Sequence, residues 1–272
     1  MKFLVPYDFT PTTHGALDYA VMLSKSFPGE IELLHIVDDE KDRASAEHKL
    51  EDVSKNMKTD KETVVTSKVR VGNIMDDINK EANEGHAQLL VMGTHGAHGL
   101  QKLLGSNAIR IVTNSKTPFV ITQEKTEASP IENIVMPVDL TKERMQILRF
   151  ATVAASKFAA KVHLVCKPES DEFLKKKLNN NIHQARQYLT KEGVANEVHI
   201  LEGKEHFYDE VIRYGRSLRA DLFAIAHYPK GILPQFDKFS QHMITNGPQT
   251  PVLIVNAAEI TGVRAQYSFI GI

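Results

Sequence analysis

The chain of 272 residues is long enough for two domains of about 130 residues, each with its own hydrophobic core. Its 33 Lys and Arg residues balance 34 Asp and Glu residues, so neither nucleic acid nor an anionic membrane surface is expected as a partner. No apolar run reaches the roughly 20 residues that span a bilayer, and no secretory signal precedes the first strand-like segment. We therefore expect a cytoplasmic protein.

Short apolar runs alternate with helical stretches in the first half, which is typical of βαβ repeats and a parallel sheet. The predicted strands span residues 3–6, 31–37, 64–71, 89–93 and 119–122. Apolar residues at helical spacing predict three helices, with buried faces at Ala16, Ala20 and Leu23, at Ala46, Leu50, Val53 and Met57, and at Ile74, Ile78 and Ala82. The predicted fold class is α/β with an open five-stranded sheet.

The second half repeats the first. Residues 4–10 (LVPYDFT) return at 135–141 (VMPVDLT), and the strand at 30–34 returns at 161–165, both at an offset of 131. Two further segments match at an offset of 133, namely 87–93 with 220–226 and 116–121 with 249–254. Four matched segments in the same order indicate a duplicated domain.

The repeat and the composition between its copies predict the domain boundaries. We expect domains at 1–124 and 131–258, a polar linker at 123–132, and a C-terminal tail at 259–272. The tail carries Tyr267, Phe269 and Ile270, which leaves open whether it packs on a neighbouring surface or frays.

The last strands of the two halves, 118–122 and 251–256, are apolar and would expose unpaired edges if each sheet stood alone. We expect them to pair and to join the halves as a pseudo-dimer.

A glycine-rich segment follows the fourth strand of the first half. It contains Gly93, Gly96 and Gly99, and the pair Gly105-Ser106 then opens a further helical stretch. Glycine lets the backbone approach a ligand closely, and a helix N-terminus favours phosphate oxygens. The pattern predicts a phosphate cradle, with a plain glycine-rich turn as the alternative.

Asp8 ends the first strand, which in an open parallel sheet lies beside the fourth strand where ligands bind. Its carboxylate can accept a hydrogen bond from a base amino group or a ribose hydroxyl. The alternative role is a helix N-cap, for which Thr10, Thr12 and Thr13 are better placed.

These motifs resemble the universal stress protein family, in its tandem-domain subgroup, over residues 1–257. The resemblance rests on Pro6-x-Asp8 at the start, Gly93-x-x-Gly96 after the fourth strand, and Gly105-Ser106 about nine residues later. It implies Rossmann-like domains with strand order 3-2-1-4-5 that hold ATP, with Mg²⁺ on its phosphates, above strands 1 and 4. The residues that the resemblance implies for this site, with their immediate neighbours, are Pro6, Tyr7, Asp8, Val37, Met92, Gly93, Thr94, His95, Gly96, Gly105, Ser106 and Asn107.

Two departures from the family pattern stand out. Eight residues separate Gly96 from Gly105 where the family's ATP-binding pattern has nine, and Gly99 can absorb the difference through positive φ. In the second half, Ala226, Pro229 and the segment 238–240 replace the glycines, so we expect no phosphate cradle there. That half then serves as a structural or dimerising copy, or it holds a different ligand through Lys230 or Lys238.

Other chemistries find no support in the sequence. There is no P-loop, no dinucleotide fingerprint and no base that could activate Ser106, so turnover is expected to be slow or absent. His95 and His98 lack the companions of a known metal motif, so no metal site is predicted, and Cys166 continues an apolar strand as a packed residue.

Two hypotheses remain. The first is an ATP-binding stress-response regulatory protein that forms a homo-oligomer and acts on a regulatory protein, with one nucleotide site per chain. The second is an adaptor that binds no nucleotide and acts through protein–protein contacts.

Overall fold

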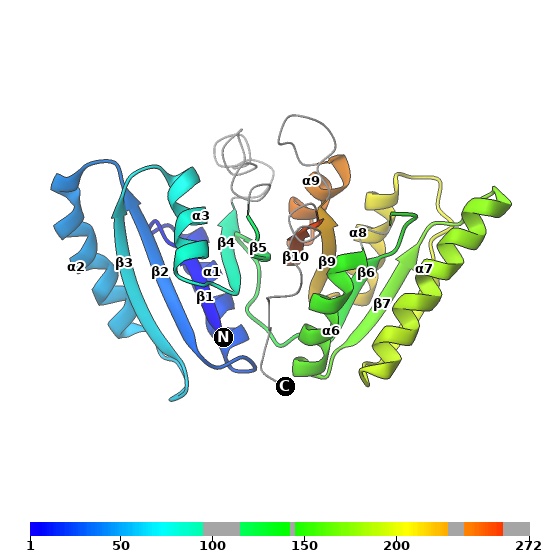
Figure 1. The fold of residues 1–272 in the computed structure, drawn as a ribbon, viewed down its shortest axis with the longest axis horizontal. Coiled ribbons are helices and arrows are strands. Elements are labelled where there is room, and N and C mark those ends of the chain that lie inside the picture. The colour runs from blue at the N-terminus through cyan, green and yellow to red at the C-terminus, as the bar shows by residue number, and fades with distance from the viewer. Residues whose placement is uncertain (95–114, 142–144, 228–236, 258–272) are drawn as a thin grey trace.

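The computed structural model describes residues 1–94, 115–141, 145–227 and 237–257, whose strands all join one sheet (Figure 1). The strands are β1 (Lys2–Pro6), β2 (Glu30–Val37), β3 (Val64–Val71), β4 (Leu89–Thr94), β5 (Phe119–Gln123), β6 (Asn133–Pro137), β7 (Lys161–Cys166), β8 (Asn196–Ile200), β9 (Leu222–His227) and β10 (Val252–Asn256). The helices are α1 (Pro11–Ser24), α2 (Glu40–Asn56), α3 (Ile74–Glu84), α6 (Ile147–Phe158), α7 (Glu172–Lys191), α8 (Phe207–Leu218) and α9 (Lys238–Ile244). No helix in these ranges is long and apolar enough to cross a membrane.

The strand order confirms the predicted fold class. It runs β3-β2-β1-β4-β5-β10-β9-β6-β7-β8, so each half has the order 3-2-1-4-5 with parallel neighbours. The halves meet where β5 and β10 pair antiparallel, with Val120 opposite Leu253 (Figure 1). The predicted pairing of the two last strands is thus confirmed, and it removes the free edge from each sheet.

Each face of this sheet carries a hydrophobic core that continues across both halves. The core under α1, α2, α6 and α7 includes Val120 of β5 and Leu253 of β10. The core on the opposite face, under α3, α8 and α9, includes Phe119 and Ile254 of the same two strands. Because side chains of a strand alternate between faces, the paired strands contribute to both cores. The two halves therefore form one packed body.

The linker is held against the second half. Gln123, expected at its start, instead closes β5 and is buried, and its side-chain amide donates to the Asn246 carbonyl at 3.1 Å. Lys125 donates its backbone N–H to Gln249 Oε1 at 2.7 Å, and the Thr126 hydroxyl donates to the Gln249 carbonyl at 2.8 Å. These hydrogen bonds hold the segment that follows β5 against the segment that precedes β10.

The predicted buried helix faces agree with the structure except at helix ends. Ala16, Ala20 and Leu50 are fully buried as expected, but Ile74 at the start of α3 is exposed and Met57 lies just beyond α2. Both residues lie at the end of a helix, where the apolar spacing in the sequence continues beyond the part of the helix that packs on the sheet. Cys166 is buried in β7, and burial raises the pKa of its thiol, as expected for a packed residue.

Candidate functional site

The central strands β1 and β4 lie side by side, and the chain after β1 forms a compact hydrogen-bonded turn. Thr10 is the N-cap of α1 and Pro11 its first residue, which suits a helix start because proline lacks only an N–H that would be unpaired there. Asp8 Oδ1 accepts from the Thr10 hydroxyl at 2.6 Å, the Thr13 hydroxyl at 2.8 Å and the Thr10 backbone N–H at 3.0 Å. The capping role thus falls to Thr10, as expected, and the threonines orient the Asp8 carboxylate.

Gly93 lets the first turn of α1 pack directly on β4. A Cβ at this position would lie 2.3 Å from the Thr12 carbonyl oxygen and 2.8 Å from its carbon. Such contacts do not occur between real atoms, so only glycine fits. The end of β4 and the Asp8 turn are consequently held together by close backbone contact.

An aromatic group supports the same turn from the side of β2. Tyr7 is buried, its hydroxyl lies 3.1 Å from His14 Nδ1, and burial raises its pKa, with a further contribution from Asp18. His35 Nδ1 lies 2.7 Å from the Tyr7 carbonyl oxygen, and its ring packs 4.9 Å from that of Phe9. Because a carbonyl can only accept, Nδ1 of His35 carries the proton. Phe9 adopts a φ of 66° and stays exposed at this edge.

The predicted site residues divide into two groups. Pro6, Asp8, Val37, Met92 and Gly93 lie at the carboxyl ends of β1, β2 and β4, whereas the polar atoms of Tyr7 and Thr94 are engaged inside the fold. The hydroxyl of buried Thr94 donates to the Thr122 carbonyl at 3.2 Å, so it fastens β4 to β5. His95, Gly96, Gly105, Ser106 and Asn107 lie outside the described residues.

The corresponding edge of the second half is built differently. Asp139 Oδ1 accepts the Thr141 N–H at 2.7 Å, which repeats the Asp8 turn. Ala226 stands where the first half has Gly93, and α6 begins only at Ile147. At the N-terminus of α9, Asp237 Oδ1 accepts the Ser240 N–H at 3.0 Å, and Oδ2 accepts the Ser240 hydroxyl at 2.9 Å. A carboxylate of the chain itself therefore lies at the helix end near which the repeat places the Gly105-Ser106 position.

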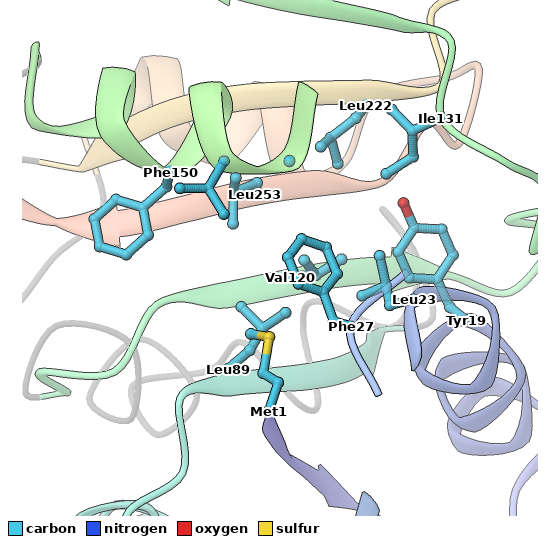
Figure 2. Close-up of a pocket in the computed structure, with 12 residues that line it drawn as sticks. Met1, Tyr19, Leu23, Phe27, Leu89, Val120, Ile131, Phe150, Leu222 and Leu253 are labelled. Carbon is cyan, nitrogen blue, oxygen red and sulfur yellow. The ribbon is translucent and has the colours of Figure 1, made fainter. Parts of the chain in front are cut away.

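A hollow between the halves is unsuited to a charged ligand. Its lining comes from both halves and includes Leu23, Phe27, Phe150 and Leu253 (Figure 2). The Tyr19 hydroxyl is the polar side-chain group in this lining, and it is buried without a hydrogen-bond partner among the described residues (Figure 2). The hollow is therefore part of the apolar interface between the halves.

Two features of the structure were not predicted from the sequence. The first is the contact of His35 with the Asp8 turn, although the place of His35 near the end of β2 puts it at the same edge. The second is the grouping of His163 on β7 with Glu197 and His199 on β8, which lie on neighbouring strands. The signal for the second group was the repeat itself, because residue 163 is a histidine where the first half has Glu32.

The order 3-2-1-4-5, with a switch point between β1 and β4, defines an open Rossmann-like α/β protein with two fused domains. Comparison with known proteins narrows this class. Residues 1–123 match the model of the Universal stress protein family. The first half therefore matches this family, and the second half repeats the same fold.

Solved structures support the fold over most of the chain. A universal stress protein from Archaeoglobus fulgidus DSM 4304 superposes with a TM-score of 0.74 at 19% identity, covering 94% of this chain and 98% of that one. A functionally unknown protein from Pseudomonas aeruginosa PAO1 gives a TM-score of 0.64 at 14% identity, covering 96% and 94%. No curated protein sequence gives a significant match.

Proposed function

We propose that this protein binds ATP, with Mg²⁺ on the phosphates, at a single site in its first half and acts as a stress-response regulator with little or no turnover. The observation that carries the proposal is the constrained edge at the ends of β1 and β4. There three hydrogen bonds orient the Asp8 carboxylate, and Gly93 brings β4 against α1. Open α/β sheets bind ligands at this switch point.

The chemistry of the edge suits a nucleoside. A fixed carboxylate can accept hydrogen bonds from ribose hydroxyls or a base amino group. Phe9, Val71 and Ile74 are exposed apolar side chains at the ends of β1 and β3 and the start of α3. Exposed apolar side chains at the same sheet edge as an oriented carboxylate are a combination that suits a base with an attached sugar. The sequence that follows, with Gly96, Gly105 and Ser106, would supply the phosphate contacts.

The asymmetry between the halves supports one site rather than two. The family match covers the half that contains the glycine segment. In the other half Asp237 already satisfies the start of α9, and its negative charge would repel a phosphate. We therefore place the nucleotide in the first half.

We expect slow turnover from the kinds of group that the proposed site contains. Glycines and a helix N-terminus bind phosphate but do not activate water. We expect a steady-state ATPase rate well below the order of 1 s⁻¹ that is common among enzymes. A rate of that order that survives repurification would contradict the regulatory role.

Matched variants at equivalent positions test the proposal. Asp8→Asn keeps an oxygen that can accept from Thr10 and Thr13 but removes the charge, and Asp139→Asn makes the same change in the second half. In isothermal titration with Mg²⁺-ATP we expect wild-type binding on the order of −8 kcal/mol, a micromolar dissociation constant. Asp8→Asn should weaken it by about 1–3 kcal/mol, the cost of a lost charged hydrogen bond, whereas Asp139→Asn should leave it unchanged.

Equal effects of the two variants would contradict the assignment to the first half. Absence of nucleotide binding by the wild-type chain would instead favour the adaptor hypothesis, in which the glycine segment is only a turn.

A further inference from the structure

Three side chains of the second half converge on one face of the sheet, between β7 and β8. His163 of β7 lies opposite Glu197 of β8, and His199 follows two residues later on the same face. His163 Nδ1 and His199 Nε2 each lie 2.8 Å from Glu197 Oε1. One carboxylate oxygen thus faces two imidazole nitrogens, and the three ligand atoms lie within 4.8 Å of one another.

A hydrogen bond fixes the orientation of the buried His163 ring. The ring is 2% exposed, and its Nε2 lies 3.1 Å from Asn133 Oδ1, which can only accept. Nε2 therefore carries a proton, and Nδ1 faces the carboxylate of Glu197. A positive charge between Nδ1 and Oε1, either a proton or a bound cation, stabilises their 2.8 Å contact.

His199 presents a second nitrogen to the same point. Its Nε2 is shielded from solvent and makes no hydrogen bond of good geometry within the described ranges, although Glu197 Oε1 is 2.8 Å away. The Tyr214 hydroxyl on α8 lies 3.1 Å from His163 Nδ1, within hydrogen-bond distance. The cluster therefore brings two imidazole nitrogens to one carboxylate oxygen.

The first half shows how the same place is neutralised when the chain provides the charge. At the positions that correspond to Asn133, His163 and His199 it has Lys2, Glu32 and Lys68. Lys2 Nζ lies 2.5 Å from Glu32 Oε2, and Lys68 Nζ lies 2.8 Å from Glu81 Oε2. Each buried carboxylate there is paired with an ammonium group of the chain, as burial of a charge requires.

The second half has an amide and an imidazole in place of these ammonium groups. Asn133 corresponds to Lys2, and His199 corresponds to Lys68. Lys161 pairs with one oxygen of Glu197, Oε2, and leaves Oε1 directed at the histidines. The chain therefore places an ammonium group at Oε2, whereas two imidazole nitrogens lie at Oε1.

We propose that His163 Nδ1, His199 Nε2 and Glu197 Oε1 bind a divalent transition-metal ion of the Zn²⁺ type. Two imidazoles and one carboxylate are an established ligand set for such ions, with a fourth position left to water. Zn²⁺ would need the ligand atoms about 3.3 Å apart, so Glu197 would move away from both histidines and the two imidazole rings would adjust around the ion. Glu197 and His199 are each 35% exposed, so the ion can enter from solvent. Asn133 would act as the outer partner that orients the His163 ring.

Zinc titration of the chelator-treated full-length chain tests the proposal. We compare the wild type with His199→Gln, which removes one half-exposed ligand, and with His48→Gln, the same change at a histidine of α2 that is 79% exposed. We expect His199→Gln to weaken the tightest zinc site by at least about 100-fold, since loss of even an outer partner costs about 10–100-fold. His48→Gln should bind zinc like the wild type. Equal affinity and stoichiometry in all three proteins would overturn the proposal and leave a proton-linked charge cluster.

A second variant tests the site in the opposite direction. Lys161→Gln removes the ammonium group that competes for Glu197, so zinc should bind about tenfold more tightly. A cluster that serves only as structural ion pairs would show no gain. Co²⁺ in place of Zn²⁺ should give visible absorption bands that shift in His199→Gln and not in His48→Gln, and identical spectra would count against coordination.

Discussion

The ends of the first and fourth strands differ between two halves that otherwise share a fold. In the first half Gly93 brings β4 against the backbone of Thr12, and α1 begins at Pro11. In the second half Ala226 takes that place, α6 begins at Ile147, and Asp237 fills the N-terminus of α9. The buried strands have kept their order while the candidate ligand edge has changed, so the residues that build the sheet differ from those that shape this edge.

A cluster of charged and polar side chains on one face of the sheet also differs between the halves. Lys2 and Lys68 neutralise Glu32 and Glu81 in the first half, whereas Asn133, His163 and His199 occupy the corresponding region of the second. The first cluster pairs carboxylates with ammonium groups of the chain, whereas the second places imidazole nitrogens beside a carboxylate. The predictions below test whether equivalent positions have separate roles.

The largest effect is expected at the contact of β4 with α1. Gly93→Ala would place a Cβ 2.3 Å from the Thr12 carbonyl oxygen, so α1 must shift, and we expect a loss of about 2–3 kcal/mol in the free energy of unfolding. The reverse change in the second half, Ala226→Gly, should cost only about 0.5–1 kcal/mol through backbone entropy. Urea denaturation of both variants measures the difference. Equal losses would show that the two edges are packed alike.

The packing of α3 and α8 on the sheet provides a second comparison between the halves. Ala82 and Leu90 of the first half correspond to Gly215 and Phe223 of the second, and a Cβ at Gly215 would lie 2.5 Å from the Phe223 ring. Gly215→Ala should therefore destabilise by about 1–2 kcal/mol despite its better helix propensity.

The double variant Gly215→Ala with Phe223→Leu recreates the first-half pair. We expect it to lose less than the sum of the single variants, with a coupling of about 1 kcal/mol in a double-mutant cycle. Strictly additive losses would mean that the small and large residues do not compensate each other.

A smaller effect concerns acid stability of the first-half cluster. Burial acts to raise the pKa of Glu81, but Lys68 and Arg70 outweigh it and hold the pKa below its ordinary value. The ionised carboxylate therefore stabilises the fold above the unfolded pKa of about 4.3, and this contribution is lost as the pH falls through the lower folded value. The stability difference between wild type and Glu81→Gln should shrink between about pH 5 and pH 3.

The control for that series is Glu40→Gln, at a side chain that is 70% exposed on α2. Its stability should stay close to that of the wild type throughout. A constant difference for Glu81→Gln across the same pH range would mean that its ion pairs do not contribute through ionisation.

Much of the fold was predictable because strand patterns are local. Runs such as Val64–Val71 coincide with β3, and the apolar last strands predicted the β5–β10 pairing that the structure confirms. The extent of each buried helix face was less predictable, because tertiary packing decides whether the end of a helix is covered. Ile74, which was predicted to be buried, is exposed at the start of α3.

The candidate site was predictable only in part. Asp8 and Gly93 were found from their places after strands, but the contact of Gly93 with Thr12 joins residues far apart in the chain. The internal engagement of Tyr7 and Thr94 also depends on partners that no local pattern names. The His163 cluster required the alignment of two repeats and the pairing of β7 with β8. Residue types and spacing can indicate the edge of the sheet where a site lies, whereas the contacts between side chains of neighbouring strands require the structure.

Native mass spectrometry of the full chain with saturating Mg²⁺-ATP tests the central claim most directly, because it counts nucleotides per chain. The proposed division of roles predicts one nucleotide per chain in the wild type and in Asp139→Asn, with reduced occupancy in Asp8→Asn. Two nucleotides per chain, or none, would contradict it.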